Sequence, residues 1–291
     1  MDVPTHRTGR VSSGEISLFY RLFDRTGGKT PLLIAHGLSY FSYDWIEAAA
    51  ALSADRQVVV MDTRGFGDSD WSAGGDYAVP TLARDIVAAL DHFGWNRAIL
   101  VGHSMSGRST SYCAAEHPGR IKGLALIDFT PENAAAGGRR VMETVAGQPD
   151  VFESVDAAMR YFKIDPHSAD EAKRARFEAY LKPVPGGLQL KRDLHFRNQF
   201  RRQRDTGERA KPGVDMWQVL GRITCPILSM RGTRSDMYAA ESVAGMKAAN
   251  PRITVVEVDA GHNIAGENLP GFLAALGPFL TSLETPHEHT T

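Results

Sequence analysis

The sequence predicts an α/β fold, with a mainly parallel central sheet, helices on both faces and an inserted helical lid. Short, continuously apolar runs recur along the chain, and such runs suit strands that are covered on both faces. Helical patterns lie between these runs, and strand–helix alternation is typical of parallel sheets. One long segment, residues 131–215, contains no convincing strand and predicts the lid.

Seven runs are predicted as strands, at residues 16–23, 31–35, 57–61, 98–101, 124–127, 227–230 and 253–258. Apolar residues at three- and four-residue spacing predict helices from Val79 to Phe93 and from Phe272 to Leu280, and Gly94 ends the first of these. Ligands of such sheets bind at the carboxyl ends of the strands. Motifs that directly follow a predicted strand are therefore the first candidates for a functional site.

The lid is expected to consist of helical fragments at 151–162, 169–181 and 191–204, interrupted by Pro-Val-Pro-Gly-Gly at 183–187. We therefore predict two units. The core comprises residues 1–130 and 216–291, and the lid comprises residues 131–215.

Composition argues against several classes of protein. The formal net charge of −1 suggests neither nucleic acid nor an anionic membrane as partner. No apolar run is long enough for a membrane span, and the first ten residues lack a secretory signal, so a cytoplasmic location is the default expectation. Cys113 and Cys225 belong to no CxxC or Cys/His cluster, and we expect buried thiols and no metal site. The expected partner is a small-molecule substrate, and a homodimer is left open.

The most informative motif is Gly102-His-Ser104-Met-Ser106-Gly107, which follows an apolar strand and begins a helix. This strand–turn–helix context is the one that a nucleophile elbow requires, because the sharp turn exposes a serine hydroxyl and needs small neighbours. The helix N-terminus also favours developing negative charge. We predict Ser104 as nucleophile and reject Ser106, which lacks the strand-end position.

A general base is predicted at His262, in Asp-Ala-Gly-His-Asn after the last apolar run. A histidine on that loop can reach Ser104 at hydrogen-bond distance. The acid that would orient the imidazole has two candidates. Asp128 ends the strand after the nucleophile helix, and Asp236 follows the next strand. We favour Asp128, because it lies at the carboxyl end of a core strand as the other motifs do, and keep Asp236 as the alternative.

Two further motifs follow early strands. After His36-Gly37, the backbone amide of Leu38 can act with the amide of Met105 as an oxyanion hole, while their side chains line the acyl pocket. The segment Asp62-Thr-Arg64-Gly-Phe-Gly-Asp-Ser69 is interpreted as structural, with Asp62 and Arg64 tying loops together.

Taken together, His36-Gly37, Asp62-x-Arg64-Gly65-x-Gly67-x-Ser69, Gly102-x-Ser104-x-Ser106 and Gly261-His262 resemble the α/β-hydrolase superfamily in order and spacing, from about residue 10 to 283 apart from the lid. Many members carry the acid three residues after the glycine at position 232, where this chain has Ser235. Position 106, usually glycine in the family, is serine.

The Asp-Phe-Thr-Pro of residues 128–131 is similar to members whose acid follows strand six, among them esterases, acetamidomethylene-succinate hydrolases and fluoroacetate dehalogenases. The dehalogenases use aspartate as nucleophile, so Ser104 argues against that chemistry and against epoxide hydrolysis. The acetamidomethylene-succinate hydrolase group is the most similar, since it shares an arginine four residues after the nucleophile and a Gly-Gly-Leu in the lid.

Arg108, one helical turn after Ser104, is predicted either to clamp a substrate carboxylate or to form a buried ion pair with a core acid such as Asp128. Most of the many lid arginines are expected on solvated faces, while one or two select anionic substrates. We expect further substrate contacts from His103, Tyr40, Phe41, Tyr161 and Phe196.

These elements predict a hydrolase of small carboxylic esters, lactones or amides, with or without an acidic group, which acts through Ser104, His262 and Asp128 and an acyl-enzyme without cofactor or metal. Two alternatives stay open. The same fold supports hydrolytic carbon–carbon cleavage or a lyase reaction on a diketone-like compound. It also supports ligand-binding receptors without turnover, because fold alone does not determine function.

Overall fold

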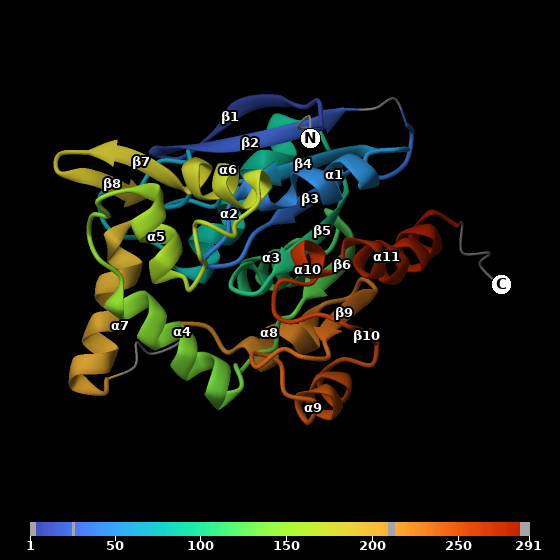
Figure 1. Ribbon diagram of the computed structural model, residues 1–291. Coiled ribbons are helices and arrows are strands. Elements are labelled where there is room, and N and C mark those ends of the chain that lie inside the picture. The colour runs from blue at the N-terminus through green and yellow to red at the C-terminus, as the bar shows by residue number, and fades with distance from the viewer. Residues whose placement is uncertain (1–3, 25–26, 209–212, 286–291) are drawn as a thin grey trace, which may run out of the picture.

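A computed structural model describes residues 4–24, 27–208 and 213–285. The described residues form a central sheet in the order β1-β2-β4-β3-β5-β6-β9-β10 (Figure 1). The bounds are β1 (Arg7–Ser13), β2 (Ile16–Asp24), β3 (Leu32–Ala35), β4 (Gln57–Met61), β5 (Ala98–His103), β6 (Ile121–Ile127), β9 (Ile227–Gly232) and β10 (Ile253–Val258). Strands β3, β4, β5, β6, β9 and β10 pair in parallel, and β1 and β2 are antiparallel additions at one edge.

The predicted fold class and all seven predicted strands are confirmed. Strand β1 was missed, because its sequence Arg-Thr-Gly-Arg-Val-Ser-Ser has no apolar run and its edge position requires none. Strand β5 shows why the inner strands are apolar throughout. Leu100 packs into the apolar cluster on one face of the sheet, and its neighbours Ile99 and Val101 pack into the cluster on the other.

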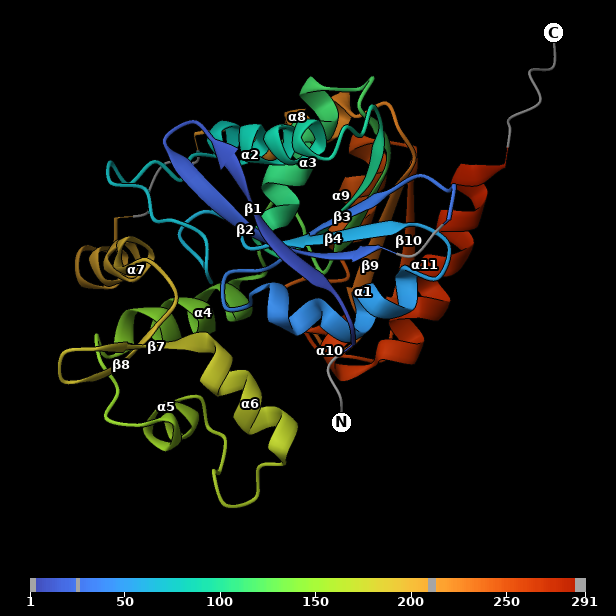
Figure 2. The ribbon, with the colours of Figure 1, turned by 90° about the horizontal axis from the view of Figure 1, so that it is seen from above.

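Helices cover both faces of the sheet (Figure 2). One face is covered by α2 (Val79–His92), α3 (Ser106–Glu116), α8 (Met216–Arg222) and α9 (Ser242–Ala249). The other is covered by η1 (Ser42–Trp45), α1 (Ile46–Leu52), α10 (Ile264–Glu267) and α11 (Leu269–Glu284). Cys113 and Cys225 are buried on the first face, as expected, and burial raises the pKa values of their thiols to about 12 and about 11.

The lid segment lies to one side of the sheet and contains four helices among its described residues (Figures 1 and 2). They are α4 (Ala135–Gly147), α5 (Val155–Tyr161), α6 (Glu171–Tyr180) and α7 (Leu194–Thr206). Helix α4 was not predicted, since Gly137 and Gly138 weaken its helical pattern. The core and lid boundaries stay a prediction, and we keep both names for those residue ranges.

The expectation that the lid contains no strand was wrong. Strands β7 (Leu181–Val184) and β8 (Gly187–Leu190) form an antiparallel hairpin within it. The prolines and glycines between the helical fragments make its turn. Pro185 pre-sets the backbone for the first turn position, and Gly186 adopts a φ of +87° that other residues rarely take.

An apolar cluster joins the lid to the core. Its buried members are Phe41 and Phe66 from the core and Phe152, Ala158, Met159, Phe177, Tyr180, Leu181, Leu190 and Phe196 from the lid. The partly buried side chains of Leu38 and Met105 pack against this cluster. The lid therefore packs on the two loops from which an oxyanion hole was predicted.

A polar contact, which we call the latch, ties α6 to η1. Arg176 Nε lies 2.5 Å from Asp44 Oδ1, and the Tyr180 hydroxyl donates a hydrogen bond to the same carboxylate. The Asp44 side chain is only 4% exposed. Burial alone would lower the pKa of Arg176, but Tyr180 and Asp44 outweigh it and raise the pKa.

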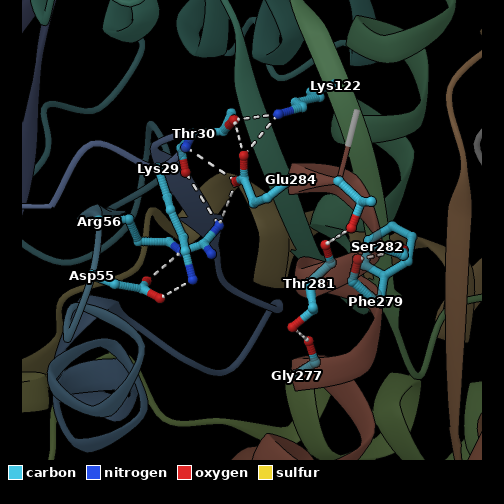
Figure 3. Close-up of polar contacts among 11 residues, drawn as sticks. Lys29, Thr30, Asp55, Arg56, Lys122, Gly277, Phe279, Thr281, Ser282 and Glu284 are labelled. Carbon is cyan, nitrogen blue, oxygen red and sulfur yellow. Dashed lines mark hydrogen bonds and ion pairs between the residues drawn. The ribbon is translucent and has the colours of Figure 1, made fainter. Parts of the chain in front are cut away.

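The end of α11 is fixed to the sheet by Glu284 (Figure 3). Its carboxylate accepts hydrogen bonds from Lys122 Nζ at 2.8 Å, from the amide and hydroxyl of Thr30 at 3.1 Å each, and from Arg56 Nη1 at 3.3 Å. These contacts join the last helix to β6 and to the two loops that flank β3 and β4. Every helix in the described ranges is too short or too polar to cross a membrane.

Candidate active site

Ser104 lies at the turn between β5 and α3 and has a φ of +52°, in the left-handed region that non-glycine residues rarely adopt. Close packing of the helix on the strand explains why residue 102 is glycine. A Cβ at Gly102 would lie 2.1 Å from Thr110 Oγ1. The turn is therefore strained at the serine, as a nucleophile elbow is.

Three predicted side chains from three loops meet at this turn. The Ser104 hydroxyl lies 2.8 Å from His262 Nε2, and His262 Nδ1 lies 2.6 Å from Asp128 Oδ2. His262 comes from the loop after β10, and Asp128 directly follows β6. The carboxylate can only accept, so the neutral imidazole carries its proton on Nδ1 and offers the lone pair of Nε2 to the serine hydroxyl.

The structure separates the two candidate acids. The Asp128 side chain is fully buried, and its other oxygen accepts a hydrogen bond from the Gly232 amide at 2.9 Å. Asp236 instead forms a two-pronged ion pair with Arg140 of the lid, at 2.6 and 2.7 Å. The hydrogen bond from Arg140 lowers the pKa of Asp236. Asp128, and not Asp236, is thus the carboxylate that contacts His262.

Ser235 is a part of the site that sequence reasoning missed. Its hydroxyl donates a hydrogen bond to Asp128 Oδ2, the oxygen that also faces His262. The sequence did mark this position, because Ser235 stands three residues after Gly232, where many family members carry the acid. Here the position holds a donor to the carboxylate instead of the carboxylate itself.

The loop of Gly37 lies against the nucleophile. A Cβ on Gly37 would lie 3.1 Å from the Cβ of Ser104. Ser106, at a position where the family usually has glycine, helps to hold this loop. Its hydroxyl donates a 2.5 Å hydrogen bond to the carbonyl of His36. Within the described ranges, the amides of Leu38 and Met105 donate to no other protein group. Both amides are therefore free to receive an oxyanion.

His36 holds this loop in place and is not available for proton transfer. Its Nδ1–H donates to the Gly37 carbonyl at 2.8 Å, and its Nε2 accepts from the Thr63 amide at 3.0 Å. Burial is the main cause that lowers the pKa of His36, although Asp62 opposes it. The neutral ring thus supports the segment that presents Leu38.

The segment from Asp62 to Ser69 was interpreted as structural, and its contacts do tie loops together. Asp62 accepts from the amides of Ser42 and Asp68, at 2.6 and 2.9 Å. Arg64 forms a buried, two-pronged ion pair with Asp85 of α2, at 2.6 and 2.7 Å. The segment also contacts the loop of His36 through the Thr63 amide.

His103 does not lie where a substrate could contact it, which corrects our expectation. Its side chain is 1% exposed, and its Nε2–H donates to the backbone carbonyl of His262 at 2.9 Å. The rings of Tyr40 and His262 both lie 5.0 Å from its ring centre. Burial lowers the pKa of His103 well below its ordinary value, and His262 adds to this effect. His103 thus holds the loop of His262 as a neutral ring.

Comparison with known proteins shows the family of this chain. A family model described as the alpha/beta hydrolase fold matches residues 30–269. The chain belongs to the α/β-hydrolase family. It is a hydrolase enzyme of that fold, as the curated relatives named below are.

Three curated relatives of this α/β hydrolase show the range of reactions. The chain is 31% identical over 242 residues to a 3-hydroxybutyrate-oligomer hydrolase of Cupriavidus necator, covering 79% of this chain and 82% of that one. It is 28% identical to a 2-(acetamidomethylene)succinate hydrolase of Mesorhizobium japonicum, covering 90% of each. It is also 28% identical to an N-formylmaleamate deformylase of Pseudomonas putida, covering 94% and 96%.

The crystal structure of an E-2-(acetamidomethylene)succinate hydrolase superposes on this α/β hydrolase with a TM-score of 0.81 and 26% identity, covering 95% of this chain and 100% of that one. The resemblance to that group, inferred from sequence motifs, is thereby confirmed. Among the described residues, no three His, Cys, Asp or Glu side chains are grouped as metal ligands would be.

The predicted ion pair between Arg108 and Asp128 does not form. Arg108 Nη2 donates only to the carbonyl of Pro131, at 3.3 Å, and none of the described carboxylates lies within ion-pair distance of it. Burial lowers the pKa of Arg108. Of its two predicted roles, the clamp for a substrate carboxylate is the one that the geometry leaves open.

The predicted aromatic contacts divide into two groups. Phe41 and Phe196 are 5% and 7% exposed and pack into the lid–core cluster of this α/β hydrolase, which argues against direct substrate contact and corrects that expectation. Tyr40 and Tyr161 are partly exposed. Tyr40 packs on His103, and the Tyr161 hydroxyl donates to the Thr144 carbonyl at 2.6 Å. Only these two retain surface that a substrate could contact.

Proposed function

We propose that this α/β hydrolase is a serine hydrolase that cleaves a small carboxylic ester, lactone or amide through an acyl-enzyme. The observation that carries the proposal is the chain of contacts from Ser104 through His262 to Asp128, at 2.8 and 2.6 Å. Nucleophile, base and orienting acid within hydrogen-bond reach of one another are the requirement for activating a serine.

In the first half of the reaction, His262 Nε2 takes the proton of the Ser104 hydroxyl as Oγ attacks the substrate carbonyl. A C–Oγ bond forms, and the amides of Leu38 and Met105 stabilise the resulting oxyanion. The tetrahedral intermediate then collapses and the bond to the leaving alcohol or amine breaks. His262 gives its proton to that leaving group.

In the second half, His262 takes a proton from water, which attacks the acyl-enzyme and releases the acid. Ser104 regains its proton from His262. Asp128 stays ionised and stabilises the imidazolium in both halves. Ser235 and the Gly232 amide, which contact the same carboxylate, hold Asp128 in orientation.

The range of substrates is supported by the relatives, whose names include an oligomer hydrolase, a succinate-derivative hydrolase and a deformylase. Arg108, without an acidic partner among the described residues, is the proposed contact for one acidic substituent of the substrate. The proposed partner is thus a small molecule.

The experiment that tests the proposal combines labelling with turnover. Wild type and Ser104→Ala are treated with a fluorophosphonate and assayed with p-nitrophenyl acetate and small acidic amides. We expect labelling at Ser104 in wild type, and a loss of kcat of at least about 10³-fold in Ser104→Ala, because the variant lacks the hydroxyl that contacts His262. Ser106→Ala, which removes a neighbouring hydroxyl of the same turn, is the matched control and should still be labelled.

The outcomes separate the proposal from its alternatives. Labelling with no turnover of any ester or amide would support a ligand-binding receptor instead. Release of two carbon fragments from a diketone, with esters inert, would support carbon–carbon cleavage. Turnover that survives in Ser104→Ala would contradict the proposed mechanism.

A further inference from the structure

Arg192, in the segment between β8 and α7 of the lid, is a buried cation with no acidic partner among the described residues. Its side chain is 4% exposed. Its donors meet only neutral oxygens, namely the carbonyl of Leu38 at 3.4 Å, the hydroxyl of Ser39 at 3.5 Å and the side-chain carbonyl of Gln148. A guanidinium cannot shed its proton in a protein, so a buried one is normally paired with an anion.

The surroundings of Arg192 do not supply that anion. Arg197 and Arg201 of α7 lie in the same region, and both use the carboxylate of Asp150, which is 59% exposed. Burial is the main cause that lowers the pKa of Arg192 to about 10, with Tyr161 opposing this effect and the charge of Arg197 adding to it. The interior between lid and core thus carries positive charge that the described carboxylates do not balance.

The position of Arg192 connects it to the site of reaction. The Leu38 carbonyl that faces Arg192 belongs to the residue whose amide is a proposed oxyanion donor. Gly37, one residue earlier, lies against Ser104. An acidic group a few bonds from the scissile carbonyl could therefore meet the guanidinium of Arg192 while that carbonyl lies at Ser104.

We propose that Arg192 recognises a carboxylate borne by the substrate, so that this α/β hydrolase prefers anionic esters or amides over neutral ones. The inference rests on the proposed serine-hydrolase function. It assigns recognition of a carboxylate to a residue of the lid that contacts the oxyanion loop, in addition to the contact proposed for Arg108. Gln148 would orient the guanidinium, because its side-chain carbonyl accepts a hydrogen bond from Nη2 of Arg192. The other nitrogen, Nη1, makes only long contacts, of 3.4 Å with the Leu38 carbonyl and 3.5 Å with the Ser39 hydroxyl, and would turn from them toward the carboxylate.

The test compares p-nitrophenyl hydrogen glutarate with its methyl ester, which has the same acyl chain without the charge. The rate without enzyme is subtracted from each. We expect wild type to show a higher kcat/KM for the acid. In Arg192→Met, which keeps an unbranched apolar stem and removes the guanidinium, the acid-to-methyl-ester ratio should fall roughly 10- to 100-fold, as expected for a lost charge-assisted hydrogen bond.

Arg202→Met is the matched control, because Arg202 is an exposed arginine of the lid on the neighbouring helix α7, and its loss should leave the ratio unchanged. Ser104-dependent turnover with equal kcat/KM for both esters in wild type, or an unchanged ratio in Arg192→Met, would overturn the inference and leave the proposed function standing. Absence of Ser104-dependent turnover of either ester would overturn the proposed function and this inference with it.

A second measurement does not depend on Arg192→Met. Free glutarate should inhibit turnover of the methyl ester by wild type competitively, and uncharged glutaramide should not. Because glutarate could also meet Arg108, its inhibition is measured in Arg108→Met as well, and inhibition that persists there supports the inference even if Arg192→Met fails to fold. Equal effects of glutarate and glutaramide would overturn it.

Discussion

At the scale of single residues, two aspartates occupy similar places in the sequence but have different partners in the structure. Asp128 and Asp236 both follow strand ends, yet one contacts His262 and the other pairs with Arg140. Two of the residues in the proposed chemistry have a strained backbone. Ser104 has a φ of +52° and Asp128 a φ of +46°. Such conformations persist only where the surrounding structure enforces them.

The division of roles between the two acids predicts opposite results for the same substitution. Asp128→Asn should lower kcat by about 10³- to 10⁴-fold, because an amide favours the wrong tautomer of His262. Asp236→Asn removes a largely exposed ion pair and should change kcat less than about threefold. Ester hydrolysis by both variants is the measurement, with thermal unfolding to show that each is folded. An inactive Asp236→Asn together with an active Asp128→Asn would contradict the assignment of Asp128 as the acid that orients His262.

Ser235 is predicted to act through Asp128 as a positioning residue. Ser235→Ala should lower kcat about tenfold, because Asp128 loses one hydrogen bond to its charged oxygen. Ser235→Thr keeps the hydroxyl and should restore most of the activity. If Ser235 had only a structural role, Ser235→Ala would lower the unfolding temperature without this selective loss of kcat. Both kcat and the unfolding temperature are therefore measured in each variant. Unchanged kcat in Ser235→Ala would show that His262 and Gly232 suffice to hold the carboxylate.

At the scale of elements, the lid is attached to the core by the apolar cluster and by the latch from α6 to η1. The latch is connected to the site, because Tyr40 lies between Arg176 and His103. The guanidinium carbon of Arg176 lies 5.7 Å from the centre of the Tyr40 ring, and that ring packs on His103 at 5.0 Å. Burial raises the pKa of Tyr40 to about 12, so its hydroxyl stays protonated at neutral pH.

Breaking the latch should loosen the lid. Arg176→Met leaves the buried carboxylate of Asp44 without its cation, and we expect a loss of about 1–3 kcal/mol in the free energy of unfolding. We also expect faster proteolysis within residues 134–206 and a higher KM. Arg174→Met is the matched control, because Arg174 lies on the same helix and pairs with Asp156 at the lid surface, where both side chains are more than a third exposed. Equal proteolysis of the two variants would mean that the apolar cluster alone holds the lid.

At the scale of the whole molecule, Glu284 joins the last helix to segments more than 160 residues earlier in the chain. Its carboxylate is 18% exposed and meets Lys122, Arg56 and Thr30. Burial would raise its pKa, but the hydrogen bond and charge of Lys122 outweigh burial and lower it. Because the pKa is lower in the folded state, Glu284 stabilises the fold above its ordinary pKa, and this stabilisation is lost as the pH falls through the folded value.

This sign predicts a pH-dependent effect of Glu284→Gln. At pH 7 the variant should unfold a few degrees below wild type, since the neutral amide cannot pair with Lys122. Near pH 4 and below, the difference should shrink as the wild-type carboxyl becomes protonated. Thermal unfolding at both pH values is the measurement. Glu116→Gln, which breaks a pair with Arg222 in which the side chains are 35% and 53% exposed, is the control and should change little at either pH. A deficit that persists at low pH would mean that shape, not charge, fixes α11.

Much of the fold could be read from the sequence because its signals are local. Continuous apolar runs identified the buried parallel strands, and Ser104 and His262 were found from short motifs at strand ends. The misses have equally local causes. The edge strand β1 is too polar to resemble a buried strand, and the hairpin β7–β8 was taken for a break because its strands have only four residues each.

By itself, the sequence determined seven of the eight strands of the main sheet, the candidates Ser104 and His262 and the family resemblance, since each depends on neighbours along the chain. Only the tertiary structure decided which acid meets His262, what Ser235 and Ser106 contact, and that Arg108 and Arg192 have no acidic partner among the described residues. Those facts depend on which side chains meet across loops and between lid and core. Such pairings join residues far apart in sequence, and neither composition nor periodicity records them.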